Sequence, residues 1–428
     1  MREATIWRRV LGLGEDTVVE SVEYDHERDA VIASVRPRVT KRSRGKRPYV
    51  LACGRCGTPA AKYDDGEGRR EWRGLDLGEC KLYLEADAPR VSCPEHGVTV
   101  ARVPWARHGS RLSRDMEDTV AWLACRAAKM VLVALLRITW RTVGAIVDRV
   151  VAEDRARSDP FDGLRRIGID EISYKRGHRY LMVVVDHDTG RLVWAGKGRS
   201  KDTLGEFFDL LGDKRCNKIR LVSADAAEFI GAVVAQRCKN ATLCTDPFHC
   251  VKWATEALDE VRRQVWNDAR RAGQRAHAKE LKGCRFALWK NPEDLTENQS
   301  AKLSWIAQSN AKLYRAYLLK EQFRQVFRLK GKRGITLLHS WLAWACRSRI
   351  PAFVKLSRKI RKNLPGIEAA LKHKLSNAIV ESTNTKLRVL ARMAYGFKEP
   401  DHLIALALLD RGGHCPPLPG RPAQAIAA

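Results

Sequence analysis

Alternating apolar and polar positions mark the beginning of the chain. Valines alternate with polar residues within 18–24 and again within 31–35, the period of short strands that bury one face. Residues 112–152 contain few turn formers, and their apolar positions follow the spacing of helices. The turn-rich segment Asp159-Pro160-Phe161-Asp162-Gly163 then predicts a domain boundary.

After this boundary the pattern changes to apolar, β-branched runs. Three runs are separated by Arg176-Gly177-His178 and Asp188-Thr189-Gly190, which predicts three antiparallel strands joined by hairpins. Two helices and two further strands follow in alternation. The order β-β-β-α-β-α-β is that of an RNase H-like fold. The strands are expected over 167–174, 180–185, 192–195, 221–225 and 242–245, and the helices over 203–211 and 226–238.

The charge balance indicates a polyanionic partner. Among 428 residues, 78 Lys and Arg stand against 50 Asp and Glu, a net charge of +28. A chain of this length has room for two to four domains, and 45% hydrophobic residues are typical of a globular protein. Nucleic acid is the favoured partner; a merely basic protein, or one lying on an anionic membrane, is the alternative.

Neither a membrane span nor a secretory leader is indicated. No apolar run approaches the ~20 residues needed to cross a bilayer, and residues 1–14 carry charges without a secretory apolar stretch. We therefore expect a cytoplasmic protein that is associated with the nucleoid when bound to DNA. Most of the twelve cysteines are scattered singly, which indicates small buried residues and not a disulfide framework.

One group of cysteines has the spacing of a zinc site. Cys53-x-x-Cys56 and Cys93-x-x-His96 form two pairs, and the glycine after each pair permits a tight turn that folds both ligands toward one ion. Strand-like residues between the pairs indicate a zinc ribbon and not a finger with a recognition helix. Two unrelated cysteine-containing turns are the alternative, but the paired spacing favours structural Zn²⁺. Cys80 has no partner at this spacing and is left out of the ligand set.

Two short amphipathic helices are expected on either side of a turn at residues 137–139. Thr139 stands where it can cap the second helix. The arrangement is typical of a helix-turn-helix, in which the first turns of the second helix face the DNA bases; a helical hairpin in some core is the alternative. The second helix would direct two residues toward DNA, Arg141 and Thr142, and two toward the protein, Val143 and Ile146.

Three carboxylates are candidates for a catalytic metal site. Asp170 falls within the first expected strand, where burial normally excludes a charge, and Asp225 ends the fourth, where reactive side chains emerge from a sheet. These two strands are neighbours in an RNase H-like order, and Glu381 on a downstream helix is the third candidate. Oxygen ligands suit Mg²⁺ or Mn²⁺, and two such ions can promote in-line attack on a phosphodiester. Three suggestive positions among 50 acidic residues can also arise by chance.

These motifs as a set resemble the DDE transposases of the ISL-three insertion-sequence family, and the resemblance spans about residues 50–420. It rests on Gly-Ile-Asp170-Glu, Val-Ser-Ala-Asp225, Asp246-Pro-Phe-His249 and Val-Glu381-Ser-Thr-Asn384, together with the two zinc-type pairs. The resemblance implies that Asp170, Asp225 and Glu381 are the catalytic triad and the ligands of the Mg²⁺ or Mn²⁺ ions. It also implies that Asp246, His249 and Asn384 lie near the active site.

The function implied by this resemblance is that of a bacterial insertion-sequence transposase. The ribbon and helix-turn-helix would bind terminal inverted repeats in double-stranded DNA, and the core would cleave the element ends and join the 3′-hydroxyl to target DNA. Pairing two ends implies a homodimer or larger assembly. A DNA-binding regulator derived from a disabled transposase, and an RNase H-like nuclease without strand transfer, remain as alternatives.

Residues 250–371 are helical in period, and their basic residues are expected to hold the DNA backbone. From Lys355 to Lys374 there are seven Lys or Arg and one acidic residue, Glu368. A solvated helix face is the alternative. The expected contacts are Arg324, Arg328, Lys330, Lys332, Arg333, Lys355, Arg358, Lys359, Arg361 and Lys362.

The expected fold class is therefore a multidomain combination of α+β and α/β parts. These parts are N-terminal strands with the zinc ribbon (1–105), the helix-turn-helix domain (106–158), an RNase H-like core with a mixed sheet (159–255 and 372–412), a basic helical insertion in that core (256–371) and a flexible tail (413–428).

Overall fold

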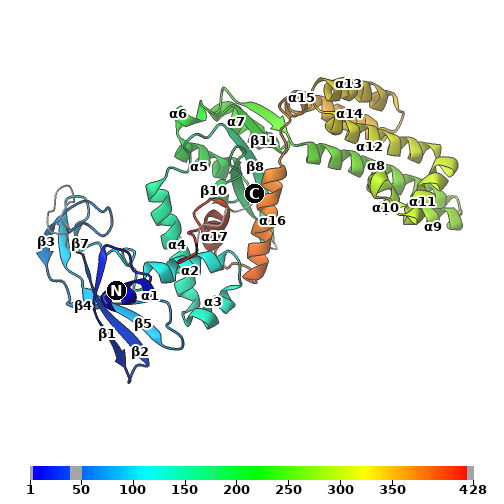
Figure 1. Ribbon diagram of the computed structural model, residues 1–428. Coiled ribbons are helices and arrows are strands. Elements are labelled where there is room, and N and C mark those ends of the chain that lie inside the picture. The colour runs from blue at the N-terminus through cyan, green and yellow to red at the C-terminus, as the bar shows by residue number, and fades with distance from the viewer. Residues whose placement is uncertain (1–2, 39–50, 176, 422–428) are drawn as a thin grey trace. The chain divides into compact units, whose positions relative to one another are not determined.

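The computed structural model (Figure 1) describes residues 3–38, 51–175 and 177–421. The chain forms two compact units. The first unit contains Met1–Asp159 and Leu390–Ala428, and the second contains Pro160–Val389. Helix α16 (Ala378–Met393) begins in the second unit and ends in the first.

The first unit opens with helix α1 (Glu3–Val10) and a four-stranded sheet of order β1-β2-β5-β4. The alternation in 18–35 predicted two of these strands correctly, with Val19 and Val35 buried. Trp72 and Trp105 pack edge to face in this core, with ring centroids 5.6 Å apart. The strands are β1 (Thr17–Asp25), β2 (Ala30–Pro37), β4 (Arg69–Arg73) and β5 (Lys81–Asp87).

A second, three-stranded sheet forms the ribbon, in the order β3-β6-β7 with antiparallel pairing. Its strands are β3 (Ala61–Asp64), β6 (Arg90–Cys93) and β7 (Gly97–Val100). Two other strands between the zinc-type pairs, β4 and β5, belong instead to the first sheet. There β5 pairs with β4 and, in parallel, with β2.

Four helices complete the first unit. Ser113 caps α2 (Arg114–Ala124) by accepting the backbone N–H of Met116. Helix α4 packs against α2, α3 and α17. His414, in the segment expected to be a tail, is buried and bonds to Asp154 at 2.7 Å; residues 422–428 of that segment lie outside the described residues. The other bounds are α3 (Lys129–Leu136), α4 (Trp140–Arg157) and α17 (Pro400–Arg411).

The second unit is built on a five-stranded mixed sheet of order β10-β9-β8-β11-β12. The strands β8, β9 and β10 are antiparallel, and β11 runs parallel to both β8 and β12. The prediction that the first and fourth strands are neighbours is therefore confirmed; Arg176, in the first expected hairpin turn, lies outside the described residues. The bounds are β8 (Arg166–Lys175), β9 (Arg179–Asp186), β10 (Leu192–Lys197), β11 (Leu221–Ala224) and β12 (Thr242–Thr245).

Helices α5 (Lys201–Leu211), α6 (Asp213–Cys216) and α7 (Glu228–Arg237) accompany this sheet. Ser200 caps α5, and the helical spacing of Leu204, Phe207 and Leu211 buries one face of the helix in a core shared with the strands.

The periodicity of residues 250–371 also predicted helices correctly. They share a core in which Phe323 and Trp341 have ring centroids 4.4 Å apart, and α15 packs on β12. Over the described ranges, no single helix combines the length and apolarity needed to cross a membrane. The helices are α8 (Pro247–Arg271), α9 (Arg275–Gly283), α10 (Arg285–Trp289), α11 (Glu297–Ser309), α12 (Ala311–Leu329), α13 (Gly331–Arg347), α14 (Pro351–Lys362) and α15 (Leu364–His373).

Candidate functional site

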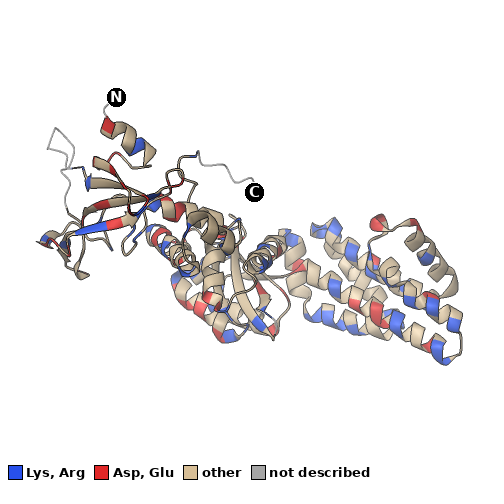
Figure 2. Cartoon of the chain, turned by 90° about the horizontal axis from the view of Figure 1, so that it is seen from below, with Lys and Arg blue, Asp and Glu red and all other residues tan. Residues whose placement is uncertain are grey.

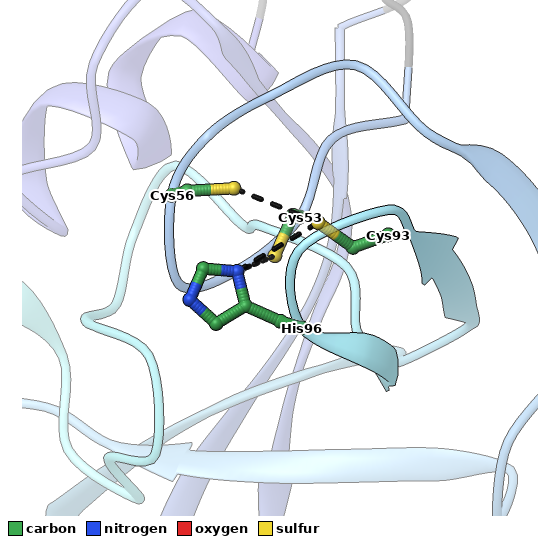
Figure 3. A group of neighbouring side chains, drawn as sticks. All are labelled: Cys53, Cys56, Cys93 and His96. Carbon is green, nitrogen blue, oxygen red and sulfur yellow. Dashed lines mark hydrogen bonds between the residues drawn. The ribbon is translucent and has the colours of Figure 1, made fainter.

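The four expected zinc ligands lie together in the ribbon (Figure 3). One ligand atom from each of Cys53, Cys56, Cys93 and His96 lies within 4.8 Å of the others. Nδ1 of His96 is 3.9 Å from Sγ of Cys53 and 3.7 Å from Sγ of Cys93, and the Sγ atoms of Cys56 and Cys93 are 3.7 Å apart. Cys80 is not in this group; its Sγ lies 3.7 Å from Oδ1 of Asp29.

The geometry of this cluster fits a tetrahedral zinc ion. Thiolate ligands about 2.3 Å from zinc lie about 3.7 Å from one another at tetrahedral angles, close to the separations found. Gly57 and Gly97 have φ of +74° and +64°, which explains why glycine follows each pair. The hydroxyl and backbone N–H of Thr58 lower the pKa of Cys56 to about 6, which favours the thiolate that zinc binds.

The expected helix-turn-helix is formed by α3 and α4. Their axes turn by 104°, within the usual range for this motif. Thr139 caps α4 by accepting the backbone N–H of Thr142 at 3.3 Å, as predicted. Val143 and Ile146 are fully buried, whereas Arg141 is exposed and Thr142 is partly exposed.

Strand register in the second unit brings Asp170 near Asp225, whose charge acts on it. In the parallel pair β8–β11, Gly168 is the partner of Ser223. Asp170 and Asp225 each lie two residues further along, so both extend from the same side of the sheet. The Oδ1 atom of Asp225 accepts the backbone N–H of Ala227 at 3.0 Å.

The two aspartates repel each other electrostatically. Burial is the main reason that the pKa of Asp170 is raised, in total to about 6; the charges of Asp225 and Asp246 also raise it, and the Glu171 N–H and the His249 charge oppose the shift. Glu171 forms an ion pair with Arg199 at 3.3 Å, and its pKa is raised by burial and by Asp225 and Asp170.

Asp246 and His249 lie beside these carboxylates, at the start of α8. Asp246 is 3% exposed, and its Oδ2 atom is 3.0 Å from Nδ1 of His249. Nε2 of His249 is 3.9 Å from Oδ2 of Asp225. The hydrogen bond with Asp246 raises the pKa of His249 against the effect of burial. The imidazole therefore stands between two carboxylates.

Helix α16 contacts the cluster through Asn384. Asn384 donates from Nδ2 to Oδ2 of Asp170 at 2.8 Å, and among the described residues its buried Oδ1 atom has no hydrogen-bond partner. Glu381 is exposed and precedes Asn384 by one turn, on the same side of the helix. The repelling carboxylates and the unpartnered amide oxygen are the hard ligands that Mg²⁺ and Mn²⁺ prefer, so the site fits such an ion.

The basic residues that are expected to contact DNA differ in their exposure and in their ion-pair partners. Arg324 is 13% exposed, and its guanidinium binds Glu293 and Glu321 at 2.9 Å. Arg328 is 56% exposed and lies 3.2 Å from Glu293. The remaining expected contacts are exposed, and Figure 2 shows Lys and Arg spread along the helices. They are Lys330, Lys332, Arg333, Lys355, Arg358, Lys359, Arg361 and Lys362.

Sequence reasoning missed the buried polar residues behind the carboxylates. Asn377 bonds to Ser223, to the carbonyl of Ile169 and to Asp246, and His187 bonds to Ser223. In the sequence, Asn377 is an asparagine at the start of the helix that carries Glu381, and this position does not reveal its distant partners.

Comparison with known proteins identifies the family. A model described as "Transposase" matches residues 167–407, one described as "zinc-finger of transposase IS204/IS1001/IS1096/IS1165" matches 50–96, and one described as "Helix-turn-helix domain of transposase family ISL3" matches 101–151. The transposase for insertion sequence element IS1557 of Mycobacterium tuberculosis (strain H37Rv) is 54% identical over 445 residues, covering 98% of each chain. The transposase for insertion sequence element IS1001 of Bordetella parapertussis is 25% identical over 356 residues, covering 82% of this chain and 87% of that one. The expected resemblance is confirmed, and the chain belongs to the ISL3 family of insertion-sequence transposases.

Proposed function

We propose that this transposase cleaves DNA at the ends of an insertion sequence and joins the freed 3′-hydroxyl to target DNA, with Asp170, Asp225 and Glu381 as its catalytic triad on an RNase H-like core. The observation that carries the proposal is the register of β8 and β11. It sets two aspartates 55 residues apart in sequence beside each other, and Asn384 ties the helix bearing Glu381 to Asp170.

The triad would act by binding divalent cations. Mg²⁺ or Mn²⁺, when bound, supplies activation of the attacking oxygen and stabilisation of the leaving oxygen of a phosphodiester. Asp170, Asp225 and Glu381 would hold the cations through carboxylate oxygens. Asn384 orients Asp170 through its Nδ2 hydrogen bond, and His249 lies where it can hold or release a proton between Asp246 and Asp225.

The first unit would supply end recognition. The exposed start of α4 presents Arg141 and Thr142 for contacts with base edges in the terminal inverted repeats, and structural zinc would hold the ribbon. The exposed basic residues of α13 and α14 would contact phosphates without reading sequence. Arg324 would then contribute only if its carboxylate partners released it. We propose that two or more copies assemble on DNA, because two ends must be paired.

Substitution of the triad tests this function. Cleavage of end-containing DNA should fall by orders of magnitude in each of the variants Asp170→Asn, Asp225→Asn and Glu381→Gln, because stabilisation by metal ions is worth several kcal/mol. Binding of that DNA should be unchanged in all three. The control is Glu297→Gln, an exposed glutamate that, like Glu381, lies in the first turn of a helix. Normal cleavage by Glu381→Gln would refute the triad.

The reaction products distinguish the alternatives. Joined target DNA is expected with Mg²⁺ or Mn²⁺, whereas Ca²⁺ should support DNA binding without cleavage because its coordination geometry is looser. Cleavage without any joined product would indicate a nuclease. Binding without cleavage by the wild-type protein would indicate a regulator.

A further inference from the structure

Asn377 is a buried amide at the junction of the segments that carry the triad. It immediately precedes α16 and is 2% exposed. A buried asparagine needs partners for both its Nδ2 hydrogens and its Oδ1 atom. The partners of Asn377 come from segments far away in the chain.

The side chain of Asn377 links the strands that carry the two aspartates. Its Nδ2 donates to the carbonyl oxygen of Ile169 at 3.3 Å, and its Oδ1 accepts the hydroxyl of Ser223. Ile169 directly precedes Asp170, and Ser223 lies two residues before Asp225. Because a carbonyl oxygen can only accept, the contact with Ile169 fixes the orientation of the amide.

The backbone of Asn377 links two further segments. Its N–H donates to Oδ1 of Asp246 at 3.2 Å, and its carbonyl oxygen accepts the N–H of Glu381 at 2.8 Å. Asp246 is the residue that binds His249. One residue thus contacts β8, β11, the start of α8 and the first turn of α16.

The fixed amide orientation also sets the hydrogen bonds behind it. Ser223 donates its only hydroxyl hydrogen to Asn377, so its oxygen accepts from His187, whose Nε2 is 2.6 Å away. Burial lowers the pKa of His187, in keeping with a neutral ring that carries its proton on Nε2. The resulting chain runs in one direction from His187 to the carbonyl of Ile169, which makes the network rigid.

We propose that Asn377 is the positioning residue of the triad, holding the backbones that carry Asp170, Asp225 and Glu381 at the spacing that shared cations require. This inference rests on the proposed function for the role of those carboxylates. An amide suits the position because it both donates and accepts while adding no charge beside the cluster.

This role can be tested in the full-length protein with three variants: Asn377→Ala, the milder Ser223→Ala and a control. The control, Asn240→Ala, removes an exposed amide whose Nδ2 makes a 3.0 Å hydrogen bond to Asn217. Loss of residues that orient metal ligands typically costs about 10- to 100-fold in metal affinity or activity. Asn377→Ala should lower kcat for cleavage by this factor with KM for DNA unchanged, and should weaken Ca²⁺ binding, measured by thermal stabilisation, by a similar factor. Ser223→Ala should show a smaller effect of the same kind, and Asn240→Ala none.

A purely structural role would give a different result. Asn377→Ala would then melt at a lower temperature but, well below that temperature, bind Ca²⁺ and cleave DNA like the wild type, and the proposal would be overturned. If Asn377→Ala does not fold, Ser223→Ala decides by the same measurements. Failure of the proposed function would give a different result from failure of this inference. Asp170→Asn and Glu381→Gln would then cleave DNA normally, and the effect of Asn377→Ala on Ca²⁺ binding could still be measured.

Discussion

Gly168 of β8 packs directly against Val380 of α16, and a single methyl group added there tests how α16 is held on the sheet. The nearest side chain is that of Val380, which is fully buried and directly precedes Glu381. Gly168→Ala should therefore disturb the third member of the proposed triad without removing any polar side chain of the site.

The size of the effect follows from the distances. A Cβ atom at position 168 would lie 2.4 Å from Cγ2 of Val380, 2.9 Å from Nε2 of His187 and 3.2 Å from Oγ of Ser223. Carbon atoms in contact rest about 3.5–4.0 Å apart, so Val380 must recede by about 1 Å. Overpacking of this kind costs about 1–3 kcal/mol of stability. A displacement of about 1 Å at Glu381 can cost about 100-fold in rate.

The assay compares cleavage rate and melting temperature in four proteins. Gly168→Ala should lose both activity and stability, and adding Val380→Ala should restore part of the activity by removing the clashing methyl groups. Gly205→Ala in α5 is the control, since among the described residues no heavy atom beyond its chain neighbours and its own helix backbone lies within 4 Å of the added Cβ, and alanine favours a helix. A Gly168→Ala protein with wild-type rate and melting temperature would refute the reasoning. So would a double variant no more active than the single one.

Three further predictions concern zinc and pH. Cys53→Ser should release one zinc ion per chain and weaken binding of end-containing DNA while leaving Ca²⁺ binding unchanged; zinc-free, well-folded wild-type protein in a metal analysis would contradict this. Burial would raise the pKa of Glu153, but the hydrogen bond from Arg114 and the charge of Arg107 outweigh it and lower that pKa to about 2. The stability contributed by ionised Glu153 is complete above its ordinary pKa of 4.5 and is lost as pH falls toward 2. In Glu153→Gln, the protection of α4 amides against hydrogen exchange should therefore change less with pH over this range than in the wild type. Identical pH profiles in the two proteins would count against the prediction. The pKa of Asp170 is raised from its ordinary value of 3.8 to about 6, so the metal-free protein should lose stability as pH rises through this range. Below pH 6, protons should compete with Ca²⁺ for the carboxylate. The Ca²⁺ concentration for half-maximal thermal stabilisation should rise about tenfold per pH unit below that value, and a flat profile would refute it.

Features encoded by local pattern were predictable from the sequence. The strand runs after residue 163 and the turns between them fix the order of elements, and the two zinc-type pairs fix their ligands through spacing. Thr139 was identifiable as a cap because N-capping requires only a short polar side chain before a helix. The burial of Val143 and Ile146 follows from helical spacing alone.

Features that depend on contacts between distant residues were not predictable. The hairpin β4–β5 has ordinary strand patterning, and nothing in it indicates that β5 pairs in parallel with β2. Arg324 resembled its basic neighbours in sequence, yet Glu293, 31 residues away, binds its guanidinium. Asn377 has partners 131, 154 and 208 residues away, so no local signal distinguishes it from an ordinary asparagine at a helix start.

Two carboxylates, the fully buried Glu117 and the partly buried Asp170, are held in opposite ways, and the difference agrees with the catalytic role proposed for Asp170. Glu117, fully buried in α2 of the first unit, binds the guanidinium groups of Arg107 and Arg149, whose positive charges balance its own. Asp170 instead receives a backbone N–H and the amide of Asn384, neither of which carries a charge, and its pKa is raised to about 6. An arginine in place of that amide would hold Asp170 equally well but would remove the repulsion that a divalent cation relieves. Neutral donors are therefore what a site for such cations requires: they orient the carboxylate and leave its charge for the ion.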